Sequence, residues 1–223
     1  MLKRAFDIVV ALVGLVFFSP LMLIVAVFIK LTSPGPVFYR APRVGKGGRA
    51  FRMYKFRTMV ADADKIGPAL TVDKDPRITR IGARLRRSRL DEIPQLINVL
   101  RGEMSMVGPR PEAPYYVEKY SPEQRKVLMV KPGMTGSAQI AFRHEEEALS
   151  NAETLEDEYM NDILPPKLAM DLKYIEQQSL SLDLKILFQT AWVLLADRLR
   201  VRSQRQVKPS QPEPPAQAYP KEV

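Results

Sequence analysis

The stretch Arg86–Pro111, RRSRLDEIPQLINVLRGEMSMVGPRP, decides how this chain is organised. Four of its apolar residues follow the i, i+3, i+4, i+7 spacing of one helix face, namely Ile93, Leu96, Ile97 and Leu100. Proline is tolerated only in the first turn of a helix, so Pro94 places the helix start close before it. Gly102 is typical of the position just after a helix end. The pattern therefore predicts a helix that begins near Asp91 and ends at Gly102.

Two adjacent carboxylates, Asp91 and Glu92, stand at the predicted helix start, directly after a run of arginines. The helix dipole and the unpaired N–H groups of a helix start favour negative charge. Nearby arginines also favour the ionised form of a carboxyl group. We therefore expect Asp91 to be a carboxylate at neutral pH and interpret it as a charged nucleophile in a pocket for anions. The alternative interpretation is that the acidic pair only caps the helix.

A single arginine, Arg110, lies between Pro109 and Pro111 in the segment GPRP. The two prolines restrict the backbone on both sides of this residue. A guanidinium group held in one direction suits bidentate binding of phosphate. Arg110 is therefore a candidate phosphate ligand, with a purely structural role as the alternative.

The charge of the chain is strongly uneven. The net charge of its 223 residues is +9, and residues 40–89 hold 15 lysines and arginines against 4 aspartates. A basic region of this density indicates an anionic partner: phosphate groups, nucleic acid or an anionic membrane face. There is no cysteine and only one histidine, His144, which excludes disulfides, thiolate metal sites and multi-histidine zinc sites.

Residues 5–30 form the only strongly apolar segment, and Ser19 and Pro20 interrupt it. A straight helix of this length would cross a bilayer. Pro20 should bend or break the helix, because it has no N–H for the carbonyl of the preceding turn. The Ser19 hydroxyl can donate a hydrogen bond to that carbonyl instead. Basic residues flank the segment on both sides, and cytoplasmic flanks carry the positive charge. A helix that re-enters the same membrane face satisfies both flanks, whereas a proline-kinked spanning helix is the alternative.

The segment after the apolar helix predicts a β-hairpin with arms Val37–Arg40 and Ala50–Phe56 and a turn at GKGG. Lys55 and Arg57 flank Phe56 on one face of the second arm, and solvated surface is the alternative for this pair. Residues 76–87 fit a short basic helix, and such a helix often lies on anionic lipid.

The chain from Asp171 to Leu199 is predicted to be largely helical, partly in the core and partly at the membrane interface. The tail from about residue 201 is rich in proline and glutamine and is predicted to be disordered. We therefore expect a mostly helical α+β fold. Its parts are a re-entrant membrane helix broken at Ser19-Pro20 (1–33), a cytoplasmic catalytic domain with a small β-hairpin and interfacial amphipathic helices (34–200), and a disordered tail (201–223).

The chain resembles the bacterial sugar transferases of the monotopic, small polyprenyl-phosphate phosphoglycosyl transferase family. The resemblance covers about residues 3–195 and rests on FDIVVAL…FFSPL, YKFRTM, LDEIPQLINVLRGEMSMVGPRP, KPGMTG and LDLKIL. It implies transfer of a phosphosugar from a UDP-sugar to undecaprenyl phosphate, with UMP as the other product, an activity of EC 2.7.8 type. Such a reaction is the first membrane step of glycan assembly, at the cytoplasmic face of the bacterial inner membrane.

The resemblance also implies roles for individual residues. Asp91 is the expected nucleophile, which forms a covalent aspartyl phosphosugar intermediate, and Glu92 orients the polyprenyl phosphate or acts as a base. Mg²⁺ is the expected cofactor, bound by Asp91 and Glu92. Phosphate binding is assigned to Arg86, Arg110, Lys55 and Arg57. The expected partners are the UDP-sugar, undecaprenyl phosphate and the membrane, with a homodimer as an option and no nucleic acid.

Two departures from the family pattern leave the sugar open. Arg89 stands where relatives more often have Ser or Thr, and the segment SAQIAFRHEEE lacks the usual Trp-Gln-Val and Asn-Gly-Arg. Two other function classes also stay open. One is a membrane-anchored basic protein that binds nucleic acid or anionic lipid, and the other is a glycosyltransferase that releases UDP.

Overall fold

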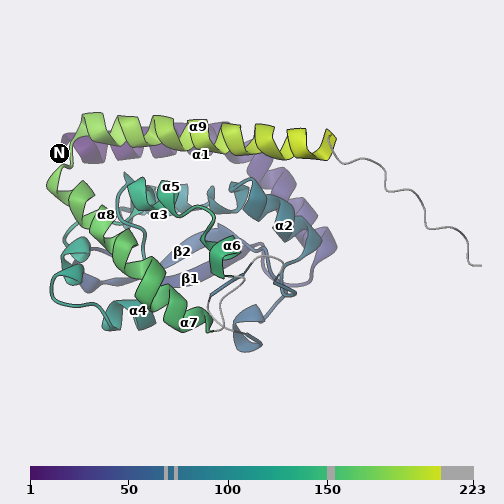
Figure 1. The fold of residues 1–223 in the computed structure, drawn as a ribbon. Coiled ribbons are helices and arrows are strands. Elements are labelled where there is room, and N and C mark those ends of the chain that lie inside the picture. The colour runs from purple at the N-terminus through teal and green to yellow at the C-terminus, as the bar shows by residue number, and fades with distance from the viewer. Residues whose placement is uncertain (68–69, 73–74, 150–153, 207–223) are drawn as a thin grey trace, which may run out of the picture.

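The computed structural model describes residues 1–67, 70–72, 75–149 and 154–206. It confirms a mostly helical α+β fold (Figure 1). Two small sheets, β1-β2 and β3-β4, lie among the helices. The elements are α1 (Leu2–Thr32), β1 (Phe38–Val44), β2 (Ala50–Phe56), α2 (Arg80–Arg87), α3 (Gln95–Arg101), β3 (Ser105–Val107), α4 (Pro114–Glu118), β4 (Gly133–Thr135), α5 (Ser137–Ala141), α6 (Glu145–Leu149), α7 (Leu155–Glu158), α8 (Leu164–Glu176) and α9 (Leu180–Gln206).

The apolar segment forms one helix, α1, that continues through Ser19 and Pro20. Pro20 has no N–H to donate to the carbonyl of Val16, and the Ser19 hydroxyl donates to that carbonyl instead, at 2.9 Å. Figure 1 shows that α1 first runs along the same edge of the molecule as α9 and then turns toward α2. The predicted break is therefore a bend within a continuous helix.

Both ends of α1 bind the same folded body. Near its start, the Lys3 ammonium lies 2.5 Å from the Asp183 carboxylate, and Arg4 donates to the carbonyl of Val99 at 2.6 Å. Just after its end, the Arg57 guanidinium donates to the carbonyl of Ser33 at 2.7 Å. The folded body therefore holds α1 at both of its ends.

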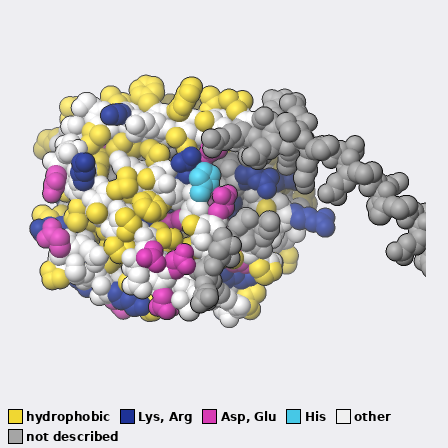
Figure 2. Space-filling model, in the orientation of Figure 1, with side chains coloured by type: hydrophobic (Ala, Val, Ile, Leu, Met, Phe, Trp, Pro, Cys, Tyr) yellow, Lys and Arg dark blue, Asp and Glu magenta, His cyan; other side chains and the backbone are white. Residues whose placement is uncertain are grey.

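One face of α1 packs on the body, and the other is exposed and apolar. The helix is long and apolar enough to cross a membrane by length and composition. Its buried residues, Asp7, Ala11, Val25 and Ile29, are distributed along its whole length. Figure 2 shows apolar side chains gathered along the edge that α1 and α9 occupy. The exposed ones include Leu12, Val16, Phe17, Ile24, Phe28, Phe188, Trp192 and Leu195.

The predicted hairpin is confirmed, with a longer first arm. β1 extends to Val44 rather than Arg40, because the antiparallel register pairs every residue from Phe38 with Phe56 to Val44 with Ala50. The buried side chain of Asn98 ties the hairpin to α3: it accepts from the Tyr54 N–H at 2.9 Å and donates to the Arg52 carbonyl at 2.8 Å. The end of β2 is therefore fixed relative to the helix that follows the acidic pair.

The predicted basic helix is α2, which starts after Thr79, whose hydroxyl accepts from the Gly82 N–H. A Cβ atom added at Gly82 would lie 1.9 Å from the carbonyl oxygen of Thr58. Glycine therefore allows α2 to lie directly against the chain that leaves β2. Its buried Leu85 packs with Val25 and Ile29 of α1 and with Phe56 of β2.

The segment KPGMTG forms β4, which pairs in parallel with β3 and leads into α5. The predicted C-terminal helical region consists of two helices, α8 and α9. The main core lies where α1, α3, β3 and α9 meet, around Ala11, Val99, Val107 and Ile186. Since α9 reaches Gln206, helix covers the first residues assigned to a disordered tail, and residues 207–223 lie outside the described part.

Candidate active site

The acidic pair lies in a 3₁₀ turn, Leu90–Glu92, just before α3. The predicted helix start near Asp91 is therefore wrong, and α3 begins at Gln95. Pro94 cannot donate a hydrogen bond, and Arg89 has a left-handed backbone (φ 56°), so the turn closes through i→i+3 bonds instead. The predicted end is confirmed, because Gly102 has φ 82° and follows the last helical residue.

Glu92 is held in its ionised form by two cations. Its Oε1 lies 2.8 Å from the Lys55 ammonium and 3.5 Å from the Arg110 guanidinium. Burial by itself would raise the pKa of Glu92, but the charges of Lys55, Arg110 and Arg89 outweigh it and hold that pKa well below its ordinary value. The structure thus brings three of the predicted residues, Glu92, Lys55 and Arg110, into one cluster.

Asp91 is buried beside this cluster, with 6% of its surface exposed. Its Oδ1 has no hydrogen-bond partner among the described residues. Burial raises the pKa of Asp91 to about 6, opposed by Lys55 and Arg86 and supported by the negative charge of Glu92. At neutral pH Asp91 is mostly ionised, as expected. Its pKa is nevertheless raised, whereas the nearby arginines led us to expect a lowered pKa. A buried, ionised carboxylate with a free oxygen is a competent nucleophile.

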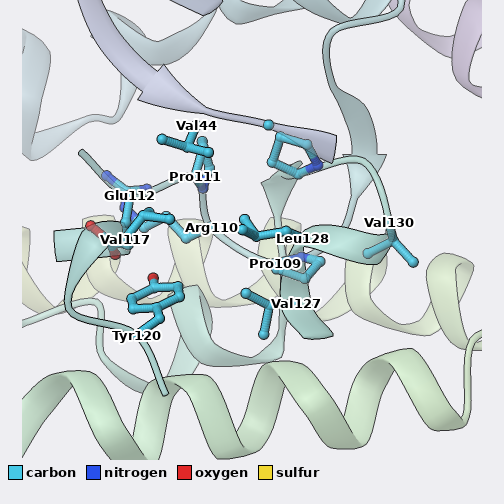
Figure 3. Close-up of a pocket in the computed structure, with 12 residues that line it drawn as sticks. Val44, Pro109, Arg110, Pro111, Glu112, Val117, Tyr120, Val127, Leu128 and Val130 are labelled. Atoms are coloured by element: carbon cyan, nitrogen blue, oxygen red, sulfur yellow. The ribbon is translucent and has the colours of Figure 1, made fainter. Parts of the chain in front are cut away.

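The GPRP segment holds Arg110 in a fixed direction. Its backbone is bonded on both sides of the arginine, because the carbonyl of Pro109 accepts from the Gly133 N–H at 2.8 Å and the carbonyl of Glu112 accepts from the Val44 N–H at 3.1 Å. Figure 3 shows Pro109 and Pro111 on either side of Arg110, within a shell that includes Val44, Val117, Tyr120, Val127 and Leu128. The prediction of a restricted arginine is confirmed.

A second charged cluster, which sequence reasoning missed, lies on the other side of Arg110. The buried Lys167 ammonium lies 2.7 Å from the carboxylate of Glu145 and 3.6 Å from that of Glu112. The Tyr159 hydroxyl donates to Glu112 at 2.9 Å. The negative charges of Glu92, Glu145 and Glu112 raise the pKa of Arg110 although burial acts against them, so Arg110 stays fully charged. The position of Glu112 directly after GPRP was the only sequence signal for this cluster.

Asp171 is a further buried carboxyl group near Arg110 that the sequence did not single out. Burial raises its pKa to about 7, opposed by Lys167 and by a hydrogen bond from the backbone of Arg110. One of its oxygens, Oδ1, has no partner among the described side chains. Asp171 thus supports the backbone of Arg110 from α8.

The structure does not bring the other two predicted phosphate ligands into contact with Glu92. Arg86, on α2, pairs with Glu146, and its charge acts on Asp91. Arg57 lies beyond the end of β2, buried, with its side chain on the carbonyl of Ser33. Strand alternation would have placed Arg57 beside Lys55. Because β2 ends at Phe56, Arg57 lies outside the strand, and its side chain is at the end of α1 instead.

The described residues contain no group of three or more Asp, Glu or His side chains that would hold a metal by themselves. Asp91 and Glu92 supply two adjacent carboxylates, of which Asp91 keeps an unpartnered oxygen. Mg²⁺ is commonly bound by one or two carboxylates together with substrate phosphates. The acidic pair fits a metal that arrives with a diphosphate.

Comparison of the sequence with known proteins places the chain in a family. The family model described as bacterial sugar transferase matches residues 1–197. The chain belongs to the bacterial sugar transferase family. The matched residues include α1, the acidic pair, GPRP and α9 as far as residue 197.

Several bacterial sugar transferases are close relatives. The chain is 41% identical over 197 residues to the UDP-N-acetylgalactosamine-undecaprenyl-phosphate N-acetylgalactosaminephosphotransferase of Aeromonas hydrophila, covering 87% of this chain and 44% of the relative. It is 42% identical over 197 residues to the UDP-glucose:undecaprenyl-phosphate glucose-1-phosphate transferase of Escherichia coli (strain K12), covering 86% and 40%. The exopolysaccharide production protein PSS of Rhizobium leguminosarum bv. phaseoli is 43% identical over 197 residues, covering 85% and 92%. The chain thus spans less than half of two relatives and nearly all of the third.

Proposed function

We propose that this protein transfers a phosphosugar from a UDP-sugar to undecaprenyl phosphate and releases UMP. The observation that carries the proposal is the buried, unpartnered Asp91 carboxylate beside the cationic pair Lys55 and Arg110. A nucleophile in such a place suits a substrate with a diphosphate. Relatives named for this transfer from UDP-sugars support the substrates.

The reaction takes two displacements. In the first, an oxygen of Asp91 forms a bond to the sugar-bearing phosphorus, the bond from this phosphorus to the bridging oxygen breaks, and UMP leaves with that oxygen. In the second, an oxygen of undecaprenyl phosphate bonds to the same phosphorus, and the Asp91 oxygen leaves as a carboxylate. Arg110 and Lys55 compensate the negative charge on the phosphates. Charge and atoms balance in each step without a net proton transfer when the acceptor enters as a dianion.

Mg²⁺ is part of this proposal. Asp91 and Glu92 are the residues that would hold it, together with the diphosphate. When bound, the cation would offset the charge of the diphosphate and of the departing UMP. Lys55 and Arg110 keep Glu92 ionised, which leaves it able to contribute an oxygen.

The proposed site of action is the cytoplasmic face of the bacterial inner membrane. The attachment of α1 to the body through Lys3 and Ser33 supports re-entry rather than crossing. The exposed apolar residues of α1 and α9 supply the surface that enters the bilayer. In this orientation the acidic pair meets the lipid phosphate at the interface.

The first experiment needs no lipid. Detergent-solubilised protein is mixed with Mg²⁺ and a panel of UDP-sugars that includes UDP-glucose and UDP-N-acetylgalactosamine, and UMP and the intact protein mass are measured. We expect stoichiometric UMP and a protein heavier by one phosphosugar, and neither in a parallel reaction with EDTA. Release of UDP would instead indicate an ordinary glycosyltransferase. Neither product, together with salt-sensitive binding of nucleic acid, would indicate a basic binding protein.

The rate of adduct formation should depend on pH through Asp91. Because burial raises the pKa of Asp91 to about 6, the nucleophilic carboxylate is the minor form below that pH. We expect the single-turnover rate of UMP release to fall about tenfold for each pH unit below 6 and to level off above about 7. Quenched-flow measurement from pH 5 to 8 tests this, and a profile that is flat down to pH 5 would contradict it.

A further inference from the structure

A cavity of about 210 Å³ is lined by Glu92 of the acidic pair and by one face of α9. Its charged lining residues are Glu92, Arg89, Arg110, Arg143, Glu145 and Lys167. Its apolar lining includes Met106, Met134, Ile140, Leu187, Val193 and Leu194, and Thr135, Gln139 and Thr190 lie among them. A ligand that fills this cavity would need a charged head and a hydrocarbon body.

Arg89 is the cation in this cavity that is open to an anion. Arg110 pairs with Glu92, Lys167 with Glu145, and Arg143 with Asp197 at 3.2 Å. Arg89 donates one N–H to the carbonyl of Arg143, at 2.8 Å, and forms no ion pair with any described residue. Its guanidinium therefore keeps its charge for a ligand that enters beside Glu92.

The apolar wall belongs to the helix that also faces outward. Leu187, Val193 and Leu194 of α9 line the cavity, whereas Phe188, Trp192 and Leu195 are 74%, 72% and 52% exposed. By helical spacing these two sets lie on opposite faces of α9. The Thr190 hydroxyl, 2.8 Å from that of Thr135, fixes the inner face to β4. One helix thus separates the cavity from the apolar edge of the molecule seen in Figure 2.

We propose that this cavity is the acceptor site and holds the phosphate and the first isoprene units of the polyprenyl phosphate. Arg89 binds the phosphate, and the wall around Leu187 and Leu194 contacts the hydrocarbon chain. A UDP-sugar is polar along its whole length and would leave this aliphatic wall without a matching surface. This assignment rests on the proposed function, because it places one of the two proposed substrates, the polyprenyl phosphate, in the cavity. It also puts the attacking phosphate oxygen beside Glu92, whose neighbour in the chain is the proposed nucleophile Asp91.

The test separates the two displacements. Leu187→Gln and Leu194→Gln change the wall, and Met129→Gln, at an exposed apolar position that does not line the cavity, is the control. Adduct formation from the UDP-sugar is measured without lipid, and discharge of the adduct is measured against undecaprenyl phosphate in detergent. We expect the wall variants to raise the KM for undecaprenyl phosphate at least tenfold more than they change the adduct rate. The control should change both by less than twofold.

Two results would overturn the assignment. Slower adduct formation with an unchanged KM for the lipid would place the UDP-sugar in the cavity. Wall variants that behave like the control would show that the wall contacts neither substrate. A wild-type protein that forms no adduct would instead refute the proposed function.

A second measurement does not depend on turnover or on the folding of variants. Wild-type protein is irradiated with a polyprenyl phosphate that carries a diazirine in its first isoprene units, and the labelled peptides are identified by mass spectrometry. Labels are expected on the residues around Leu187–Leu194 and around Met134–Ile140. Labels confined to the outer face of α1 would contradict the proposal.

Discussion

Asp91→Asn is expected to abolish both UMP release and the phosphosugar adduct, with a loss of about 10³-fold or more in the single-turnover rate. Asparagine keeps the shape of the side chain but offers no carboxylate to attack phosphorus. Asp162→Asn, a change of the same type at an exposed position, is the matched control and should leave the rate unchanged. An adduct of normal mass and rate in Asp91→Asn would show that another residue is the nucleophile.

The same variant should be as stable as the wild type or more stable at pH 8. Burial raises the pKa of Asp91 above its unfolded value, so the wild type loses stability as the pH rises from about 4 to 6. Asparagine is neutral at every pH and escapes this cost, which is of the order of 3 kcal/mol for a shift of this size. Thermal unfolding at pH 4 and pH 8 measures the difference, which should be present at pH 8 and vanish at pH 4. Lost activity with retained stability separates loss of chemistry from loss of fold.

Asp183→Ala is expected to give the largest loss of stability. The Asp183 carboxylate is fully buried and binds the Lys3 ammonium at 2.5 Å and the Tyr174 hydroxyl at 2.6 Å. Its removal leaves the part-buried Lys3 ammonium and the buried Tyr174 hydroxyl with only the Val107 carbonyl to share, at 3.2 Å from each, which costs about 3 kcal/mol. We expect the thermal midpoint in detergent to fall by roughly 10 °C.

The control for this prediction is Asp157→Ala, which removes an exposed carboxylate from α7 and should leave the midpoint unchanged. A double-mutant cycle of Lys3→Met and Asp183→Asn measures the coupling between α1 and α9 directly. A midpoint for Asp183→Ala within 2 °C of the wild type would show that this buried cluster does not hold the two helices together.

Features set by local chemistry could be predicted from the sequence. Gly102 has the left-handed backbone that ends α3, and the glycine-rich turn places the two arms of the hairpin in register. As expected, the Ser19 hydroxyl donates to the carbonyl of Val16, to which Pro20 has no N–H to donate. The acidic pair could be singled out because a run of arginines precedes it in the chain. Arg110 could be singled out because the prolines on either side restrict its backbone.

Features set by contacts between distant segments could not be predicted. Glu112 lies in the loop before α4, Glu145 on α6 and Lys167 on α8, and the three meet only in the folded chain. Glu145 belongs to a run of three glutamates, and only the folded chain shows that its carboxylate is turned inward to Lys167 and Arg110. The direction in which the pKa of Asp91 is shifted also depends on burial, and burial cannot be inferred from the spacing of charged residues in the sequence.

The attachment of α1 at both ends, through Lys3 and Ser33, has a consequence for the membranes in which the protein can work. A helix that crosses a bilayer must match the thickness of the hydrocarbon layer, and a mismatch tilts it or deforms the lipid. A bent helix held at both ends by one body has no opposite surface to reach. In the re-entrant arrangement proposed above, the depth of the Asp91 carboxylate is set by the fold alone, and we expect bilayers of different thickness to present the lipid phosphate to it at the same height.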